Sequence, residues 1–453
     1  MKIDKATKNN GLQLKVSITS SLQLPTSNFQ PPTSNFQPPT SNLQLPTSSL
    51  QPPTSNFQPP TSNLQLPTSN LQPPTSNLQP PTSNFQPPTS NLLIPVTKPF
   101  LPPKATYQRY IDDIWERNWL TNNGPLVNEL ELQLKEYLAL DHLLFVGNGT
   151  IALQLAIKAL DLKGEIITTP FSYVATTSSI MWEGCQPVYV DILASTLTID
   201  PAKIEAAITS HTSAILATHV YGIPCDVEAI QTIADKHGLK VIYDAAHSFG
   251  VKVNGKSIFE YGDISTTSFH ATKLFHTVEG GAVITKSAEL TRKLSLLRNF
   301  GHAGPYEFEG MGINGKNSEF HAAMGLSVLP HISEILSNRK EQSERYKKLL
   351  KGLEITYPNN VHIEDYNYSY FPIIFPSEAI LEKTMEALEA NGIASRRYFY
   401  PSLNKLDEKS ASCPISEDLS SRIVCLPLYY SLTAEEQRMI ARILLRVQNN
   451  PNQ

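Results

Sequence analysis

The sequence has few cysteines and no long apolar segment. Its four cysteines, at positions 185, 225, 413 and 425, lie far apart and form no C-x-x-C pair. A disulfide framework or a structural zinc site is therefore not expected, and a reducing cytoplasm fits best. No run of roughly 18 apolar residues occurs, which argues against a transmembrane helix. Residues 1–19 contain four lysines but no continuous apolar stretch, so they do not resemble a secretory signal.

Charged residues are absent from a long segment near the N-terminus. Residues 20–89 are ten seven-residue units of the type Ser-Asn-Leu/Phe-Gln-Pro/Leu-Pro-Thr, with 17 of the 35 prolines and no Asp, Glu, Lys or Arg. A period of seven is typical of coiled coils, but a proline inside a helix costs roughly 3 kcal/mol. After a short tail at 1–19, we predict an unstructured, extended arm over 20–96. A proline-rich docking array for a partner domain remains open.

The remainder of the chain is mildly acidic. Of the 37 basic and 41 acidic residues, four lysines and one aspartate precede residue 90, which leaves 33 and 40 and a net charge of −7. Such a balance provides no basic surface for nucleic acid or for an anionic membrane. We therefore expect neither as a partner.

Strand and helix patterns alternate from about residue 101. Apolar runs predict strands at 143–146, 165–169, 188–191, 214–218 and 239–243, and amphipathic patterns predict helices at 125–140, 151–160 and 227–237. This alternation is typical of an α/β fold whose mostly parallel sheet carries helices on both faces. We predict a large domain over 101–350 and a small α/β domain over 351–448, with a strand near 370–375 and a helix at 379–391. Ligands of such sheets bind outside the carboxyl ends of the strands.

The first of these strands is followed by Gly147-Asn148-Gly149-Thr150-Ile151-Ala152. The segment places backbone N–H groups and a hydroxyl at a helix N-terminus, which is a suitable site for an anion. Its letters also fit the dinucleotide fingerprint G-x-G-x-x-A, but the next strand ends in Thr168-Thr169-Pro170 and lacks the acid that would hold a ribose. A helix cap without any ligand is the third interpretation.

Two further segments at strand ends carry an acid and an amine. Asp244 ends a strand and could point into the cleft or cap the following segment. Lys273 closes a loop beginning at Thr267, and Glu279-Gly280-Gly281 follows; alone, it could be a solvated lysine. Together, the three segments supply what pyridoxal 5′-phosphate requires: an anion site, a carboxylate for the ring nitrogen and an amine for a Schiff base.

Several motifs resemble the DegT/StrS family of sugar aminotransferases, over roughly residues 105–448. They include GNGTIALQLAIKAL (147–160), PFSYVATTSSI (170–180), VIYDAAHSFG (241–250) and SFHATKLFHTVEGGAV (268–283). The combination Ser-Phe-His-x-x-Lys with a later Glu-Gly-Gly is specific to this family. The resemblance implies the fold type I architecture of pyridoxal-phosphate enzymes, with a large mostly parallel-sheet domain and a small C-terminal α/β domain.

The resemblance also implies roles for individual residues around the cofactor. Lys273 would form the Schiff base and move the catalytic proton, and Asp244 would pair with the ring nitrogen. The remaining cofactor-binding positions would be Gly149, Thr150 and Ser268 at the phosphate, Tyr173 stacked on the ring, His247 beside the phenolic oxygen, and Asn314 reaching the phosphate of a neighbouring subunit. The last of these implies a homodimer.

The substrate-binding positions implied by the resemblance lie in the segment SRRYFYP. Arg397 and Tyr400 are expected to contact the substrate, and Arg396 and Arg397 are the candidates for meeting the diphosphate of a sugar nucleotide. His219 and His276 are expected to have packing roles.

Within the family, the motifs look most similar to enzymes that aminate the 4-keto group of a dTDP-linked 6-deoxyhexose. The implied reaction is a ping-pong transfer from L-glutamate, serving amino-sugar and polysaccharide biosynthesis. A 3-keto-sugar aminotransferase, a pyridoxal-phosphate-dependent sugar dehydratase and a non-catalytic regulatory homologue remain as alternatives. Two departures from common family patterns, Leu274 and Gly315-Lys316, leave the substrate details open.

Overall fold

The computed structural model describes residues 94–360, 363, 365–407 and 410–449. The predictions for the tail at 1–19 and for residues 20–93 of the repeat lie outside the described residues. Residues 94–96, which the prediction includes in the low-complexity segment, pair with the C-terminal part of the chain. The carbonyl of Ile94 accepts from the Ala394 N–H at 2.9 Å, and that of Val96 accepts from the Leu428 N–H at 3.2 Å.

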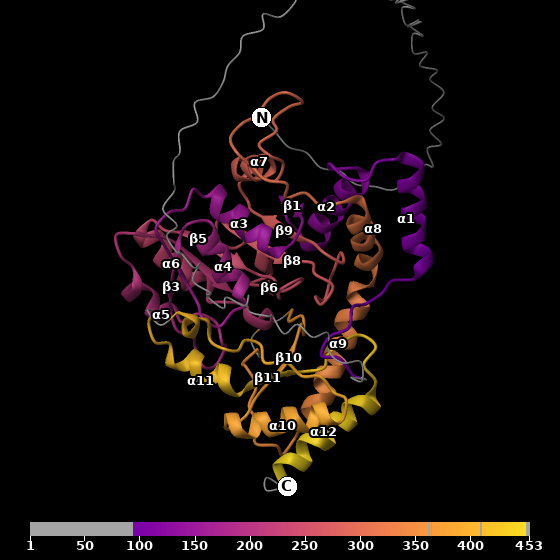
Figure 1. Cartoon of the computed structure of the whole chain (residues 1–453), viewed down its shortest axis with the longest axis vertical. Helices are drawn as coiled ribbons and strands as arrows, with labels where there is room; N and C mark the ends of the chain where they lie inside the picture. The colour runs from indigo at the N-terminus through magenta and orange to yellow at the C-terminus, as the bar shows by residue number, and fades with distance from the viewer. Residues whose placement is uncertain (1–93, 361–362, 364, 408–409, 450–453) are drawn as a thin grey trace, which may run out of the picture. The chain divides into compact units, whose positions relative to one another are not determined.

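A seven-stranded sheet in the order β1-β9-β8-β5-β4-β2-β3 forms the centre of the larger part of the fold (Figure 1). Its strands are β1 (Leu143–Val146), β2 (Glu165–Thr168), β3 (Gln186–Tyr189), β4 (Thr212–Thr218), β5 (Lys240–Asp244), β8 (Ile264–Ser268) and β9 (Gly281–Ile284). The pairings from β3 through β2, β4 and β5 to β8 are parallel. Only β9 runs antiparallel to its neighbours β8 and β1. The sheet is therefore mostly parallel, as predicted.

Helices cover both faces of this sheet because its strands are apolar on both sides. Residues such as Ile167, Ile215 and Val241 share one core with α2 (Pro125–Leu138), α6 (Val227–His237) and α8 (Glu319–Val328). Their chain neighbours on the opposite face share a second core with α3 (Gly149–Ala159), α4 (Val174–Trp182) and α7 (Ala288–Leu297). The remaining elements of this part are α1 (Lys104–Arg117), α5 (Pro201–Ile204) and the hairpin β6 (Lys252–Val253) and β7 (Lys256–Ser257).

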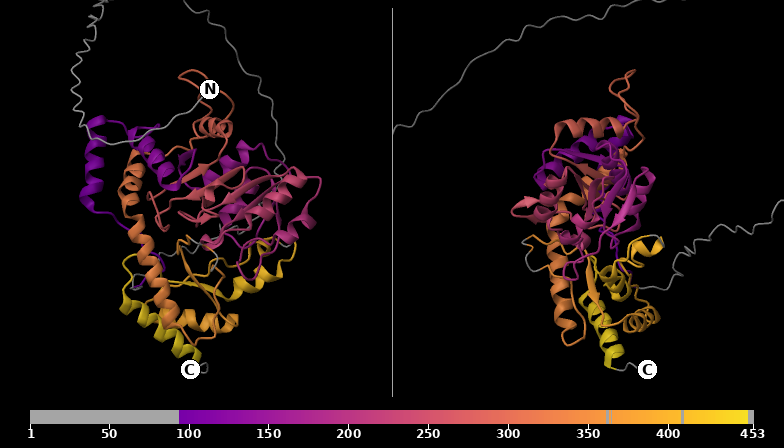
Figure 2. Two further views of the ribbon diagram at one scale, coloured as in Figure 1. Left: turned by 180° about the vertical axis from the view of Figure 1, so that it is seen from behind. Right: turned by 90° about the vertical axis from the view of Figure 1, so that its left-hand side faces the viewer.

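A smaller antiparallel sheet, β10 (Phe371–Ile374) and β11 (Ile423–Leu426), has a core of its own. It packs with α10 (Glu378–Ala390) and α12 (Ala434–Asn449), while α11 (Pro414–Arg422) leads into β11. The long helix α9 (Ile332–Leu349) connects the two parts, and both views show it running along one side of them (Figure 2). Its N-terminal residues belong to the large core, and Tyr346 belongs to the small one.

Local interactions explain where the elements begin and end. Helix α3 starts at Gly149, two residues before the predicted start, because the Asn148 side chain caps it by accepting from the Ile151 N–H at 2.8 Å. Helix α6 has the predicted bounds, with Gly238 in the left-handed conformation after its last residue. The prediction placed Thr267 and Ser268 in a loop, but both belong to β8, where hydrogen bonding to β9 extends the strand. Among the described helices, none is long and apolar enough to cross a membrane.

Candidate active site

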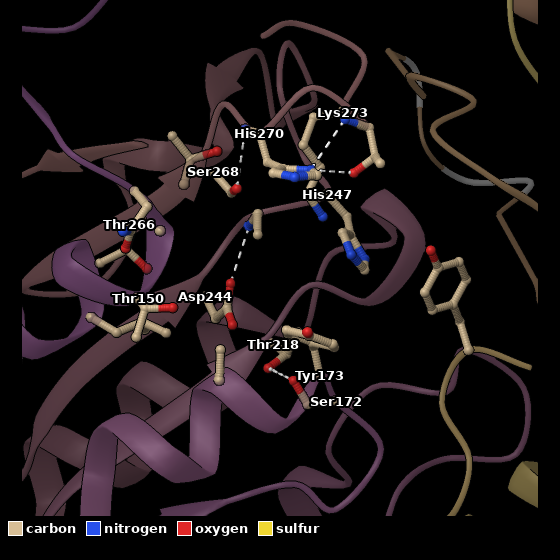
Figure 3. Close-up of a pocket in the computed structure, with 18 of the residues that line it drawn as sticks. Thr150, Ser172, Tyr173, Thr218, Asp244, His247, Thr266, Ser268, His270 and Lys273 are labelled. Atoms are coloured by element: carbon tan, nitrogen blue, oxygen red, sulfur yellow. Dashed lines mark hydrogen bonds between the residues drawn. The ribbon is translucent and has the colours of Figure 1, made fainter. Parts of the chain in front are cut away.

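One cavity of about 390 Å³ lies at the carboxyl ends of β4, β5 and β8, where the fold class predicts a ligand (Figure 3). Arg396 and seven of the ten other residues that the sequence predicts for the site line it; the seven are Gly149, Thr150, Tyr173, Asp244, His247, Ser268 and Lys273. They come from the N-terminal ends of α3 and α4, the end of β5, and β8 with the segment that follows it. The fold thus brings together residues that are up to 124 positions apart in the chain.

The start of α3 is pressed against β8 and β9 with almost no space between them. A Cβ atom on Gly149 would lie 2.9 Å from the Ser268 Cβ, and one on Gly281 would lie 2.6 Å from the carbonyl carbon of Asn148. Glycine at both positions allows the helix N-terminus and the Ser268 hydroxyl to share one corner of the cavity. The first backbone N–H groups of a helix have no acceptor in a preceding turn, so this corner attracts an anion.

Asp244 is almost fully buried, at 7% exposure, at the end of β5. Its Oδ2 accepts from the Thr176 hydroxyl at 2.8 Å, and its Oδ1 accepts from the Ala246 N–H at 3.1 Å. Burial raises the pKa of this carboxyl, while the two hydrogen bonds and the positive charge of Lys273 lower it. The carboxylate is held in a fixed orientation and faces a cation across the cavity.

Lys273 follows β8 and donates from its Nζ to the Tyr370 hydroxyl at 3.3 Å. Burial lowers the pKa of the amine to about 8, although the charge of Asp244 acts in the opposite direction. A substantial fraction of this amine is therefore neutral near pH 8, which a nucleophilic lysine requires.

His247 lies two residues beyond Ala245 on the same loop as Asp244 and is buried. Its Nδ1 accepts from the Tyr221 N–H at 3.1 Å, so the neutral ring carries its proton on Nε2. Burial, followed by the charge of Lys273, lowers the pKa of His247 well below its ordinary value. Tyr173, just before α4, has 54% of its surface exposed and lines the cavity as a free aromatic face.

Three predicted site residues do not line the cavity of the described chain. Asn314 is exposed in a segment that pairs with Asn299. Arg397 donates to the Glu378 carboxylate at 2.6 Å and to the Ser421 carbonyl at 2.5 Å, and its guanidinium lies 3.5 Å from the centre of the Tyr400 ring. Arg397 and Tyr400 therefore pack together outside the cavity. Arg396, the other predicted candidate for the diphosphate, does line it.

The sequence did not identify Thr176, Tyr370 or Tyr398. Tyr370 and Tyr398 line the cavity from the small part of the fold, and Thr176 lies behind its wall. The sequence could have indicated Thr176, since it follows the predicted site residue Tyr173 by three positions and so lies about one helical turn away. For Tyr370, which is 97 positions from Lys273, the sequence offers no comparable signal. His219 and His276 have the expected packing contacts: each Nδ1 accepts from a backbone N–H, at 3.0 and 3.3 Å.

These groups match the chemistry of pyridoxal 5′-phosphate. The corner between Gly149 and Ser268 suits a phosphate, Asp244 suits a ring nitrogen that carries a proton, and Lys273 suits an aldehyde. All three features line the same cavity, and Tyr173 lines it too.

A family model described as the DegT/DnrJ/EryC1/StrS aminotransferase family matches residues 103–445. The chain belongs to this family. Membership confirms the resemblance seen in the motifs, and it removes the dinucleotide interpretation of Gly147-Asn148-Gly149.

This aminotransferase is 44% identical over 364 residues to the dTDP-4-amino-4,6-dideoxy-D-glucose transaminase of Escherichia coli, covering 77% of this chain and 97% of the relative. The structure of DesI in the presence of its TDP-sugar product is 31% identical, with a TM-score of 0.76 over 79% of this chain and 93% of that one. The structure of NtdA from Bacillus subtilis with bound cofactor PMP is 29% identical, with a TM-score of 0.71 over 76% and 82% of the two chains. Aminotransferases of this family depend on pyridoxal 5′-phosphate, of which PMP is the aminated form.

Proposed function

We propose that this aminotransferase moves the amino group of L-glutamate to the 4-keto group of a dTDP-linked 6-deoxyhexose. The observation that carries the proposal is the convergence of the Lys273 amine, the Asp244 carboxylate and the N-terminus of α3 on one cavity. The 44% identical E. coli relative, whose name specifies a dTDP-4-amino-4,6-dideoxy-D-glucose product, supports the choice of sugar.

When bound, pyridoxal 5′-phosphate supplies a carbonyl that carries the amino group between the two substrates and a protonated ring that accepts electron density. We assign its phosphate to Gly149, Thr150 and Ser268, because a helix N-terminus and a hydroxyl meet at that corner. Tyr173 would cover one face of the ring.

Asp244 would hold a proton on the ring nitrogen, because an ionised carboxylate favours the protonated form of a neighbouring base. His247 would donate from Nε2 to the phenolic oxygen, since its Nδ1 already accepts from the Tyr221 N–H. Asp244 ends β5 and His247 follows it by three residues, which sets their spacing.

Lys273 would act as the base and acid of the reaction. Because its pKa is lowered to about 8, the amine can accept a proton from substrate carbon and return it within the same cavity. Glutamate and the keto-sugar would use this machinery in turn, which gives ping-pong kinetics.

Arg396 is the residue that we assign to the diphosphate of the sugar nucleotide. It is exposed at the cavity, its guanidinium lies 5.0 Å from the centre of the Tyr398 ring, and a guanidinium can bind phosphate oxygens in pairs. Arg397, the other of the two predicted candidates for the diphosphate, is already bound to Glu378. Of the predicted substrate-binding residues, the proposal therefore keeps Arg396 and leaves out Arg397 and Tyr400.

We also propose a homodimer in which Asn314 of each subunit reaches the phosphate bound by the other. Asn314 is exposed and lies on a loop with other exposed side chains, including Tyr306 and Met311 at 94% and 84% exposure. The four cysteines are free thiols buried in the fold, which suits the reducing cytoplasm where we place the reaction.

The test is to incubate the purified protein with glutamate and a panel of keto-sugar nucleotides and to determine the aminated carbon by NMR. A dTDP-4-amino-4,6-dideoxyhexose is the expected product, and Lys273→Ala should abolish both its formation and the visible absorption of the bound cofactor. A 3-amino product or loss of a sugar hydroxyl would identify one of the alternative enzymes instead. A protein that neither changes colour with glutamate nor aminates any sugar would refute the enzymatic function.

A further inference from the structure

A chain of three buried hydroxyl groups leads to Asp244: Ser172 and Thr218 line the cavity, and Thr176 lies behind its wall. The Thr176 hydroxyl donates to Asp244 Oδ2 at 2.8 Å. The Ser172 hydroxyl lies 2.7 Å from that of Thr176. The Thr218 hydroxyl lies 3.0 Å from that of Ser172, and Figure 3 shows this second contact. These three side chains are 0%, 1% and 4% exposed, so each hydroxyl must find its partners inside the protein.

The direction of every hydrogen bond in this chain follows from the ionised carboxylate. A hydroxyl has one proton, and Thr176 donates its own to Asp244, which can only accept. Ser172 must therefore donate to Thr176, and Thr218 must donate to Ser172. All three O–H dipoles point toward Asp244, and hydrogen bonds aligned in this way polarise and strengthen one another.

A helix, the loop before it and a strand supply these hydroxyls. Ser172 precedes α4, Thr176 lies in its first turn, and Thr218 ends β4 directly beside Asp244, its partner in the parallel pairing of β4 with β5. The carboxylate is therefore tied to a neighbouring strand and to a helix, independently of any ligand.

We propose that Thr176 is a positioning residue that, backed by Ser172 and Thr218, keeps Asp244 ionised and aimed at the ring nitrogen of the cofactor. This inference rests on the proposed function, because it requires bound pyridoxal 5′-phosphate. Thr176 does not line the cavity, so it would act on the cofactor through Asp244, to which its hydroxyl donates.

The Thr176 hydrogen bond should decide whether the proton shared by Asp244 and the ring nitrogen lies on the nitrogen or on the carboxylate. Burial raises the pKa of Asp244, and the Thr176 hydrogen bond is the largest influence that lowers it. Without this bond the carboxylate becomes the stronger base and draws the proton from the ring nitrogen. The ring then becomes a weaker electron acceptor, and both amino-transfer half-reactions slow down.

The experiment compares Thr176→Val, which keeps the shape but lacks the donor, with Thr176→Ser, which restores it. Ser179→Ala is the matched control, since Ser179 is a fully buried hydroxyl in the same helix with no hydrogen-bond partner among the described residues. Each holoenzyme is prepared with cofactor labelled with ¹⁵N in the ring, and the nitrogen chemical shift is recorded together with kcat and KM for the glutamate half-reaction.

For Thr176→Val we expect the ¹⁵N signal to move toward that of neutral pyridine and kcat to fall about 10-fold to 100-fold, the size of one lost hydrogen bond to a charged group. KM for glutamate should change little, and Thr176→Ser should recover most of both losses. Ser179→Ala should retain the wild-type signal and rate. If Thr176→Val does not fold, Ser172→Ala takes its place, with a smaller shift in the same direction.

An unchanged ¹⁵N signal in the folded Thr176→Val holoenzyme, or in Ser172→Ala in its place, would overturn the inference. So would an equal shift in Ser179→Ala, because the effect would then report general disturbance of the helix. These results differ from failure of the proposed function, in which the wild-type protein itself would bind no labelled cofactor.

Discussion

Substituting Gly149 by alanine tests whether the close contact between α3 and β8 forms the phosphate site. The new Cβ would lie 2.9 Å from the Ser268 Cβ and 3.4 Å from its hydroxyl oxygen, so the two segments must separate by about half an ångström. Overpacking of this kind costs typically 1–3 kcal/mol. An opposing contribution of roughly 0.4–1 kcal/mol favours the folded protein, because alanine reduces the conformational freedom of the unfolded chain. The destabilisation by the close contact is larger than this gain, and it occurs at the corner of the cavity that would hold the phosphate.

We therefore expect Gly149→Ala to weaken binding of pyridoxal 5′-phosphate by the apoenzyme about 10-fold to 100-fold, as measured by absorbance or fluorescence titration. The matched control is Gly147→Ala in the same loop, where the nearest atom to a new Cβ is the Gly315 carbonyl oxygen at 3.8 Å, an ordinary contact. This variant should bind the cofactor as the wild type does. Equal affinity in both variants and the wild type would show that the phosphate does not depend on this corner.

Three further predictions concern charge. Because the pKa of Lys273 is lowered to about 8, the rate at which the apoenzyme binds the cofactor covalently should rise with pH and level off above about pH 8. The Asp244→Asn variant lacks the charge that raises this pKa, so the midpoint of its pH–rate profile should move to lower pH. A stopped-flow pH–rate profile with a midpoint near 10 would contradict the assignment. Arg396→Gln should raise KM for the sugar nucleotide about tenfold or more with a smaller change in kcat, and an unchanged KM in steady-state assays would exclude the diphosphate contact. Glu319 is fully buried and accepts from two backbone N–H groups at the start of α2, each at 3.0 Å. In urea unfolding, Glu319→Ala should therefore lower the free energy of unfolding by about 2–4 kcal/mol, whereas the control Glu289→Ala, at an exposed position, should lower it by less than about 1 kcal/mol. Equal losses in the two variants would contradict this account.

Most of the fold could be predicted because its elements have strong local signals. The bounds of β1 and α6 are as predicted, since a short apolar run and a capped amphipathic pattern define them. No bounds were predicted for β8, the strand before the Lys273 segment, and β9 was missed: β8 ends in Ser265-Thr266-Thr267-Ser268 and β9 begins with glycine. Both are strands because they pair with each other in the centre of the sheet, which overrides their weak local preference.

Some residues of the candidate site could likewise be predicted from the sequence, and others could not. Glycines, an acid and a lysine at strand ends can be found in the sequence because each stands at a recognisable boundary of an element. The sequence does not show which of the neighbours Arg396 and Arg397 meets the substrate. That depends on which guanidinium pairs with a carboxylate once the chain has folded, and here Arg397 pairs with Glu378.

The amino-acid sequence by itself determined the family, most of the strands and helices along the chain, and the chemical types of the groups that meet a cofactor, since these are properties of neighbouring residues. Only the tertiary structure decided how those groups are supported. The three hydroxyls behind Asp244, the tyrosine beside Lys273 and the close approach of Ser268 to Gly149 all arise between segments distant in the chain. Hydrogen-bond distances and close contacts between such segments exist only once the sheet has brought its strand ends to one edge.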